Sequence, residues 1–384
     1  MSQNGIDYQI RAYIGMDQDS DLPVSVSEWR QKARELLADG PWWYLEGAAG
    51  NNDTMNNNIN AFQQYAIRPR YLRNVENREQ NIEIFGKKYD SPFILAPIGV
   101  QSIIHKDAEM ASAGAAAEMG VPFILSTVSS KSIEEISTAY PDSEKWFQLY
   151  PGKDEKVMES MIHRAEKAGY TAIIVTVDTT MLGWREQDLK NAYLPFLLGE
   201  GIANFTTDPE FRKRLSSTPE NDMQSAIEEF LTIYVNPAFQ WEDFKKIRKI
   251  TRLPLLIKGI THIEDVRLAA KYGADGVIIS NHGGRQVDGA IPAIKALEMA
   301  CSEKLPITVL FDSGIRHGAD AMKALALGAS AILIGRPYCY ALGVAGKRGV
   351  VRYLAQLKSE LDLQMGLSGF NSLSALSSSD IIKI

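Results

Sequence analysis

Short apolar runs recur along the chain, and turn residues flank each of them. Runs of this length are typical of strands that are buried on both faces of a parallel sheet. We predict eight such strands, beginning at residues 92, 122, 145, 171, 254, 276, 308 and 331. Successive strands begin 22–32 residues apart, except for an interval of 83 residues between the fourth and the fifth. Each shorter interval has room for one helix and two short loops.

The intervals between the strands carry helical periodicity. Helices are predicted from residues 107, 154, 261 and 317, and each stretch ends on a glycine suited to a helix C-terminus. Thr261 and Glu264 have the spacing of a capping box. Eight alternating strands and helices close naturally into a (β/α)8 TIM barrel. A doubly wound sheet is the alternative fold, but no Gly-x-Gly-x-x-Gly motif follows a predicted strand.

Two segments lie outside the repeat and define the expected domain organisation. Residues 1–91 are predicted to form an N-terminal helical cap that covers the barrel bottom and returns an active-site segment to its mouth. Residues 92–384 then form the barrel, with an insertion at about 188–240 in the loop after the fourth strand. Loops of this length are seldom without a role, so the insertion is expected to be a lid or an interface arm.

Composition narrows the possible partners. Lys and Arg total 41 against 47 Asp and Glu, a net charge of −6 without long basic runs, which argues against nucleic acid as a partner. No signal peptide or membrane-spanning stretch is recognisable, so we expect a cytoplasmic protein that does not enter the membrane. Cys301 and Cys339 cannot form a disulfide framework or a four-ligand zinc site, and we expect no metal.

Polar residues gather at the ends of the predicted strands, where a barrel carries its working groups. They are Gln148, Tyr150, Thr176, Asp178, Arg185, Lys258, Ser280, His282, Arg285, Asp312, Arg316, Gly335 and Arg336. Four arginines and a lysine at one mouth imply at least two anionic groups bound there, because like charges at close range are costly.

The last two strand ends are candidates for one of these anions. The loops after strands seven and eight are the usual phosphate site of such barrels. Asp312-Ser313-Gly314-Ile315-Arg316 and Gly335-Arg336 combine small residues with guanidinium groups that grip phosphate. The alternative is that Arg316 and Arg336 are ordinary surface or helix-cap arginines.

The remaining cluster has the groups that a 2-hydroxy acid needs. Arg185 and Arg285 would hold a carboxylate, Tyr44 or Tyr150 would contact the hydroxyl or carboxylate, and His282 would take a proton. Asp178, expected on a neighbouring strand, could orient the imidazole and stabilise its protonated form. The other histidines singled out, His105, His163 and His262, are expected to be structural or solvent-exposed.

Lys258 permits two interpretations. A lysine at the end of a barrel strand can form a Schiff base, which would make the protein a lyase. Together with Gln148 and Thr176, however, it forms a set of ammonium, amide and hydroxyl groups suited to the edge of a flavin ring. We favour the flavin.

Several motifs in order along the chain extend this picture. SNHGGRQVDG (280–289), LLIKG (255–259), DSGIRHGADAMKALALGA (312–329), ILIGRPY (332–338), QLY (148–150) and TVDTTMLGWRE (176–186) are the relevant strings. Together they resemble the FMN-dependent 2-hydroxy-acid oxidising family, over nearly the whole chain. The stretch 183–211 and Ser313, where most members have glycine, look closest to lactate 2-monooxygenase.

The resemblance implies residue roles. Pro97, Ile98 and Gly99 would lie along FMN, with Ser126, Gln148 and Thr176 at its polar edge and Lys258 and Ser280 nearby. Asp312, Ser313, Gly314, Arg316, Gly335 and Arg336 would hold its phosphate and ribityl chain. Tyr44, Tyr150, Arg185 and Arg285 match substrate-binding positions, and His282 matches the family base. Gly99, Ser313 and His317 depart from the commonest family residues.

The resemblance also implies a reaction. We expect oxidation of an (S)-2-hydroxy acid, with L-lactate as the substrate, through either hydride transfer or a carbanion. Dioxygen would reoxidise the flavin, and retention of pyruvate and peroxide under the insertion would give acetate, carbon dioxide and water. Release of pyruvate and peroxide, as in L-lactate oxidase, is the alternative outcome. The resemblance also implies a homotetramer or homo-octamer.

Besides the flavin enzyme and the Schiff-base lyase, a third possible functional class is a noncatalytic metabolite sensor.

Overall fold

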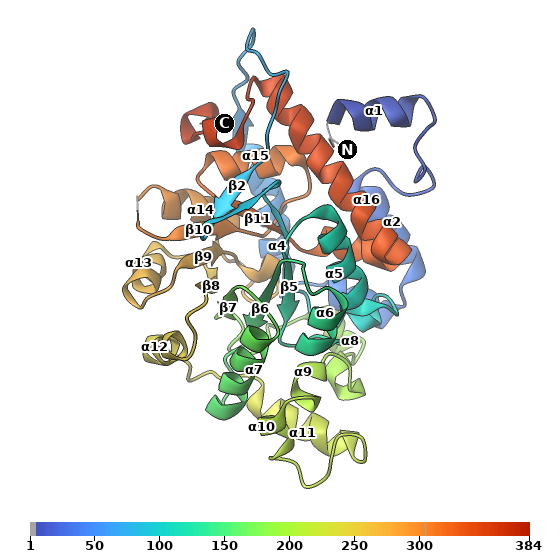
Figure 1. Ribbon diagram of the computed structural model, residues 1–384, viewed down its shortest axis with the longest axis vertical. Coiled ribbons are helices and arrows are strands. Elements are labelled where there is room, and N and C mark those ends of the chain that lie inside the picture. The colour runs from blue at the N-terminus through green and yellow to red at the C-terminus, as the bar shows by residue number, and fades with distance from the viewer. Residues whose placement is uncertain (1–4, 304) are drawn as a thin grey trace.

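The eight predicted strands form one closed, all-parallel barrel in the computed structural model, which describes residues 5–303 and 305–384 (Figure 1). Residues 1–4 of the expected N-terminal segment lie outside the described residues. The barrel strands are β4 (Phe93–Leu95), β5 (Phe123–Ser126), β6 (Lys145–Leu149), β7 (Ile173–Thr176), β8 (Leu255–Ile260), β9 (Gly276–Ile279), β10 (Thr308–Phe311) and β11 (Ala331–Ile334). Pairing of Leu333 on β11 with Ile94 on β4 closes the circle, which confirms the (β/α)8 fold.

Helices surround the barrel on its outer side (Figure 1). They are α5 (Ala108–Met119), α6 (Ile133–Ala139), α7 (Glu155–Lys167), α12 (Trp241–Ile250), α13 (Ile263–Lys271), α14 (Ala293–Cys301), α15 (Gly318–Ala326) and α16 (Arg336–Ser368). All four helices predicted from residues 107, 154, 261 and 317 are present. The Thr261–Glu264 capping box is wrong, because α13 begins one residue later and the His262 imidazole accepts the Glu264 N–H at 3.2 Å.

Strand alternation places every second residue inside the barrel. The inner apolar layer contains Ile94, Ile124, Trp146, Ile174, Leu256, Ile278, Leu310 and Leu333. The alternate positions, such as Phe147 and Ile257, pack outward in the core shared with the helices. The interior is therefore a filled core, and ligands can reach the barrel only at its ends.

One end of this core is closed by a hairpin of β2 (Ile82–Ile84) and β3 (Lys87–Tyr89). Ile84 and Tyr89 are buried in the inner layer, and the Phe85 ring lies 6.3 Å from that of Trp146. Hydrophobic burial thus seals the amino-terminal end of the barrel and leaves the carboxyl-terminal end for chemistry.

The N-terminal helices pack along the outside and reach the open end. Helices α1 (Gly5–Tyr13) and α2 (Val26–Leu36) lie against α16, as Figure 1 shows. Helix α3 (Asp39–Glu46) and α4 (Asp53–Asn60) follow, and β1 (Tyr65–Ile67) pairs with the C-terminal β12 (Ile381–Lys383). The proposed division at residue 91 stays a prediction.

The insertion between β7 and α12 is a helical unit with its own core. It contains α8 (Glu186–Lys190), α9 (Ala203–Thr206), α10 (Pro209–Arg212) and α11 (Met223–Ile233). The Phe230 ring lies 5.2 Å from Phe196, 4.8 Å from Phe205 and 4.9 Å from Tyr234. Aromatic packing therefore orders this insertion, which would be loosely ordered if it were a simple loop of the same length.

No helix within residues 5–303 and 305–384 combines the length and apolar character needed to traverse a bilayer. Across the same residues, His, Cys, Asp and Glu side chains form no group of three that could hold a metal ion.

Replacing Phe230 with alanine should destabilise the insertion, so that it unfolds locally while the barrel stays folded. The buried ring fills the centre of the aromatic cluster, and its loss should cost about 3–5 kcal/mol. Limited proteolysis should then cut within residues 186–233 faster than in the parent protein. Leu231→Ala, at a partly exposed position on the same helix, should change the cutting rate little, and equal rates for the two variants would contradict this account.

Candidate functional site

A second inward layer lies one step beyond the apolar one, at the carboxyl ends of the strands. Two residues after each apolar position, the chain carries Ala96, Ser126, Gln148, Thr176, Lys258, Ser280, Asp312 and Gly335. Because alternation points these residues to the same side as the layer below, the strands themselves position them. Two of these positions are charged, and they lie at the floor of the open end.

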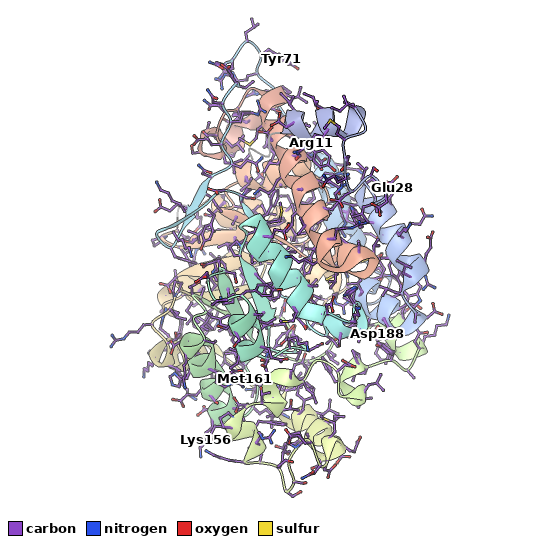
Figure 2. All side chains as sticks on the ribbon, turned by 45° about the vertical axis from the view of Figure 1, so that its right-hand side comes forward. Arg11, Glu28, Tyr71, Lys156, Met161 and Asp188 are labelled. Atoms are coloured by element: carbon purple, nitrogen blue, oxygen red, sulfur yellow. The ribbon has the colours of Figure 1, made fainter. Side chains whose placement is uncertain are left out.

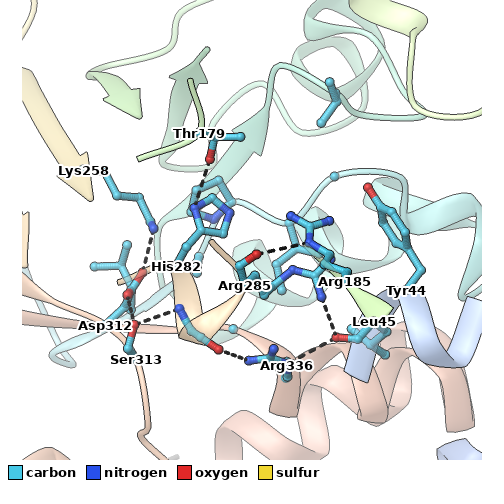
Figure 3. A pocket seen from close by; sticks show the side chains of 18 of the residues that line it. Tyr44, Leu45, Thr179, Arg185, Lys258, His282, Arg285, Asp312, Ser313 and Arg336 are labelled. Carbon is cyan, nitrogen blue, oxygen red and sulfur yellow. Dashed lines mark hydrogen bonds and ion pairs between the residues drawn. The ribbon is translucent and has the colours of Figure 1, made fainter. Parts of the chain in front are cut away.

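A solvent-open cleft of about 1120 Å³ lies above this floor (Figure 3). Most of the predicted site residues line it. They are Tyr44, Pro97, Ile98, Gly99, Tyr150, Arg185, Lys258, His282, Arg285, Asp312, Ser313, Gly314, Arg316, Gly335 and Arg336. Ser126, Gln148, Thr176, Asp178 and Ser280 lie behind this lining, whereas His105, His163 and His262 are away from it.

His282 and Asp178 form a close pair at one side of the cleft. Nδ1 of His282 lies 2.7 Å from Oδ1 of Asp178, and the Thr179 hydroxyl donates to the same oxygen at 3.1 Å. Burial lowers the pKa of His282 below 6.5, although Asp178 opposes the shift. Burial would raise the pKa of Asp178, but His282 and Lys258 hold it below its usual value. A neutral imidazole with Nδ1–H donated to a carboxylate leaves Nε2 as a proton acceptor.

A glycine makes this pair possible. Asp178 follows β7 and His282 follows β9, so β8 lies between the two residues. Gly259 on β8 has a φ of +102°, and a Cβ there would lie 2.5 Å from the Asp178 carboxyl carbon. The missing side chain therefore lets Asp178 reach across β8, which corrects the expectation that the two residues follow adjacent strands.

Three guanidinium groups also line the cleft, those of buried Arg185 and Arg336 and of half-buried Arg285. Arg285 donates to the Gly47 carbonyl at 2.6 Å, and Arg336 donates to Gly47 at 3.1 Å and to Gly283 at 2.9 Å. Arg185 donates to the Arg285 carbonyl at 3.2 Å. Burial, together with Arg185 and Arg336, lowers the pKa of Arg285 to about 9. Carbonyl oxygens orient these groups without neutralising them, so the cluster favours an anionic ligand.

Two tyrosines, Tyr44 and Tyr150, also line the cleft. The Arg285 guanidinium lies 5.4 Å from the centre of the Tyr44 ring, a cation–π contact. Tyr150 packs against Tyr234 of the insertion, with ring centres 5.7 Å apart. Burial raises the pKa of both Tyr44 and Tyr150, so each hydroxyl remains a hydrogen-bond donor at neutral pH.

Lys258 is held as a cation. Its ammonium lies 3.1 Å from Asp312 Oδ2 and donates to the Ser280 hydroxyl at 3.0 Å. Burial alone would lower its pKa, but Asp312 and Asp178 raise it above the ordinary value. A Schiff base requires a neutral amine, so this environment argues against a lyase.

In the polar layer that includes Lys258, two buried atoms have no partner among the described residues: Gln148 Nε2 and Thr176 Oγ1. The other end of the Gln148 amide is fixed, because its oxygen accepts from the Ser126 hydroxyl at 3.0 Å. Buried polar groups normally find a partner, and each unmet one costs roughly 1–3 kcal/mol. An amide donor, a hydroxyl and an ammonium along one floor fit the polar edge of a flavin ring.

The far end of the cleft has the features of a phosphate site. Helix α16 begins at Arg336 directly after Gly335, so its first N–H groups lie at the lining. Ser313 has a φ of 83°, a conformation that favours glycine, and its hydroxyl accepts from the Gly283 N–H at 3.1 Å. That contact ties the loop after β10 to the histidine-bearing turn and accounts for a serine at this position.

Four contributors were not identified from the sequence. They are Thr179, Gln286, Phe196 and Tyr234. Gln286 accepts from Arg185 at 3.0 Å and donates to the Asp178 carbonyl at 2.9 Å, so it links Arg185 to the backbone of Asp178. Thr179 and Gln286 each directly follow a predicted residue, which was the available signal. Phe196 and Tyr234 come from the insertion, whose path no periodic pattern specified.

Comparison with known proteins agrees with this geometry. The pattern of the FMN-dependent dehydrogenase family matches residues 33–383. An L-lactate oxidase of Lysinibacillus sphaericus (strain C3-41) is 40% identical over 363 residues, covering 94% of this chain and 93% of that protein. Crystal structures of mandelate oxidase (36% identity, TM-score 0.83, 94% of this chain and 98% of that one) and of a soluble mutant of the membrane-associated (S)-mandelate dehydrogenase from Pseudomonas putida (34%, 0.85, 94% and 100%) share the fold.

These similarities extend over nearly the whole chain and include the cleft. They identify the cofactor as FMN and the reaction as oxidation of the CH–OH group of a 2-hydroxy acid. The chain therefore belongs to the FMN-dependent dehydrogenase family.

Proposed function

We propose that this enzyme oxidises an (S)-2-hydroxy acid, with L-lactate as the substrate and dioxygen as the electron acceptor. The observation that carries the proposal is that buried Arg185 and half-buried Arg285 line the same cleft as His282, which is paired with Asp178. A carboxylate and a neighbouring hydroxyl are the two groups that such a site binds at once. The similarity to L-lactate oxidase supports lactate among such acids.

In this mechanism the chain's own groups bind and orient the substrate. Arg185 and Arg285 hold the carboxylate, and Tyr44 and Tyr150 donate to its oxygens or to the hydroxyl. Nε2 of His282 accepts the hydroxyl proton, and Asp178 stabilises the imidazolium that results. FMN, when bound, would supply the redox chemistry, with two electrons passing from the substrate carbon through the flavin to dioxygen.

The residues proposed to hold FMN divide by position. Pro97, Ile98 and Gly99 would line one face of the ring. Ser126, Gln148, Thr176, Lys258 and Ser280 would form its polar edge, and Asp312, Ser313, Gly314, Arg316, Gly335 and Arg336 would hold the ribityl chain and phosphate. A side chain at Gly99 would collide with the Val128 carbonyl, so glycine keeps this wall close to the cleft.

The insertion is proposed to decide the final product. Phe196 and Tyr234 line the cleft, and the Asn204 amide donates to the Ser126 and Thr127 carbonyls at 3.1 Å. A segment anchored in this way would keep pyruvate and peroxide together, so that peroxide converts pyruvate to acetate, carbon dioxide and water. The enzyme would then be a lactate 2-monooxygenase. The 40% identity to an L-lactate oxidase favours the second candidate, release of pyruvate and peroxide.

The assembly and location of the enzyme are also proposals. The enzyme is proposed to be cytoplasmic, and by its family resemblance to be a homotetramer or homo-octamer. Exposed apolar side chains beside the cleft, Met181, Trp184 and Val287, support burial of this face in an assembly.

Aerobic turnover with L-lactate, with acetate, pyruvate and peroxide assayed in one reaction, tests the proposed function. Acetate in proportion to oxygen consumed is expected for the monooxygenase. Pyruvate and peroxide in equal amounts would establish the oxidase instead. Absence of all three products, from protein that carries FMN, would contradict lactate as the substrate.

Replacing Asp178 with asparagine should alter the pH dependence of kcat/KM. The wild-type rate should fall only as the pH drops below the His282 pKa, which burial keeps under 6.5. Without the carboxylate that opposes this shift, the pKa falls further and the acid limb moves to lower pH. Because the imidazolium is no longer stabilised, kcat should fall by about 100-fold to 10,000-fold.

His282→Gln should keep its yellow FMN and lose nearly all turnover. A limb that moves to higher pH, or turnover preserved in His282→Gln, would contradict these roles.

Replacing Thr176 with valine should have opposite effects on the apoprotein and on cofactor binding. Its hydroxyl is buried without a partner among the described residues, so the change should leave the apoprotein melting temperature unchanged or higher. Loss of a contact to FMN should raise the Kd for FMN by about twofold to tenfold, measured by flavin fluorescence.

The matched control is Thr127→Val. The Thr127 hydroxyl donates to the Gln148 carbonyl at 2.6 Å and accepts from the Tyr150 N–H at 2.8 Å, so its loss should lower the apoprotein melting temperature. A Thr176→Val apoprotein that is less stable yet binds FMN normally would show that this hydroxyl does not face the cofactor.

A further inference from the structure

One largely buried carboxylate, that of Asp188, lies near the substrate-binding arginines and has no part in the mechanism above. Asp188, labelled in Figure 2, lies on α8 of the insertion. Helix α8 packs against α3 of the N-terminal segment. The Asp188 side chain is only 13% exposed. A carboxylate in such a place normally has a strong hydrogen-bond partner.

Asp188 lacks such a partner. Its Oδ2 lies 3.8 Å from Nη1 of Arg185, beyond hydrogen-bond distance, and its Oδ1 is buried with no partner among the described residues. Arg185 is oriented instead by the Arg285 carbonyl at 3.2 Å and by Gln286 at 3.0 Å. Asp188 therefore contributes charge near the guanidinium groups without fixing their geometry.

The charge matters because of what surrounds it. Arg185 and Arg285 are the main cations that act on Asp188, from its own loop and from the turn after β9. The charge of Asp188 also acts on two tyrosines and raises the pKa of each. They are Tyr44 on α3 and Tyr193, five residues after Asp188 in the sequence. Burial raises the pKa of Asp188 and the two arginines oppose that shift. The carboxylate is thus costly to keep charged, and the cationic pair is what offsets the cost.

We propose that Asp188 is the resident counter-ion of the Arg185–Arg285 pair and competes electrostatically with the carboxylate of substrate and product. The inference rests on the proposed function, in which these arginines bind that carboxylate. A bound acid places a second anion beside the same guanidinium groups, so Asp188 weakens its binding and hastens release of an acidic product. Asp188 is a specificity-determining residue that sets how strongly the site prefers an anion, and it takes no part in the chemistry.

A pair of ligands that differ only in charge tests the proposal. 2-Hydroxy-2-methylpropanoate has no hydrogen on its hydroxyl-bearing carbon, so it binds without being oxidised, and its primary amide is the neutral counterpart. The Kd of each is measured from the change in flavin absorbance of the FMN-loaded enzyme. In Asp188→Asn the acid should bind about tenfold more tightly, because a like charge beside the same guanidinium groups has been removed. The Kd of the amide should change by less than about twofold.

Two further variants separate this effect from a structural one. Glu186→Gln removes the same charge from an exposed position on the same helix and should leave both Kd values unchanged. Asp188→Ser removes the charge with a smaller side chain and should tighten the acid in the same direction as Asp188→Asn. With L-lactate, the KM of Asp188→Asn should fall more than its kcat.

The possible outcomes are distinct. Weaker or unchanged binding of the acid in Asp188→Asn, an equal change for acid and amide, or opposite signs in the two Asp188 variants would overturn the counter-ion role. A wild-type enzyme that holds FMN but does not bind the acid would instead overturn the proposed function.

Discussion

The central constraint on this protein is the burial of guanidinium groups at the open end of a barrel. Arg285 and Arg336 are held by carbonyls that follow α3, and Arg185 is held by the turn that carries Arg285. Carbonyl oxygens orient a cation but do not cancel its charge, so the site keeps an excess of positive charge until anions bind. The N-terminal segment, the barrel and the insertion all meet here, which explains why three separate parts of the chain are needed to form one cleft.

The barrel supplies stability and chemistry from successive layers of the same strands. Ile174, Leu256 and Ile278 belong to the apolar layer, and two residues later Thr176, Lys258 and Ser280 form part of the polar layer at the open end. The apolar layer, together with the β2–β3 hairpin that closes it, packs like any protein interior. The upper layer carries unmet polar atoms and ion pairs, and these are the groups proposed to hold FMN. Stability and function therefore occupy different depths of one architecture.

The fold could be predicted largely from the sequence, because each buried strand is a local pattern of apolar residues between turns. The same local pattern predicts that Gln148, Lys258 and Asp312 lie together at one end of the barrel. Other features depend on contacts between distant segments and have no local signal. Gly259 matters because Asp178 crosses over it, and His262, rather than Thr261, caps α13. The aromatic core of the insertion likewise depends on contact between Phe196 and Phe230, which no periodic pattern connects.

The central claim is that surplus positive charge at the cleft draws a hydroxy acid onto FMN. Its most direct test is the visible spectrum of the FMN-loaded enzyme without oxygen, after addition of L-lactate or of its neutral analogue L-lactamide. The account predicts rapid loss of the yellow colour with L-lactate and little change with L-lactamide at the same concentration. Equal bleaching by both compounds, or none with either, would contradict it.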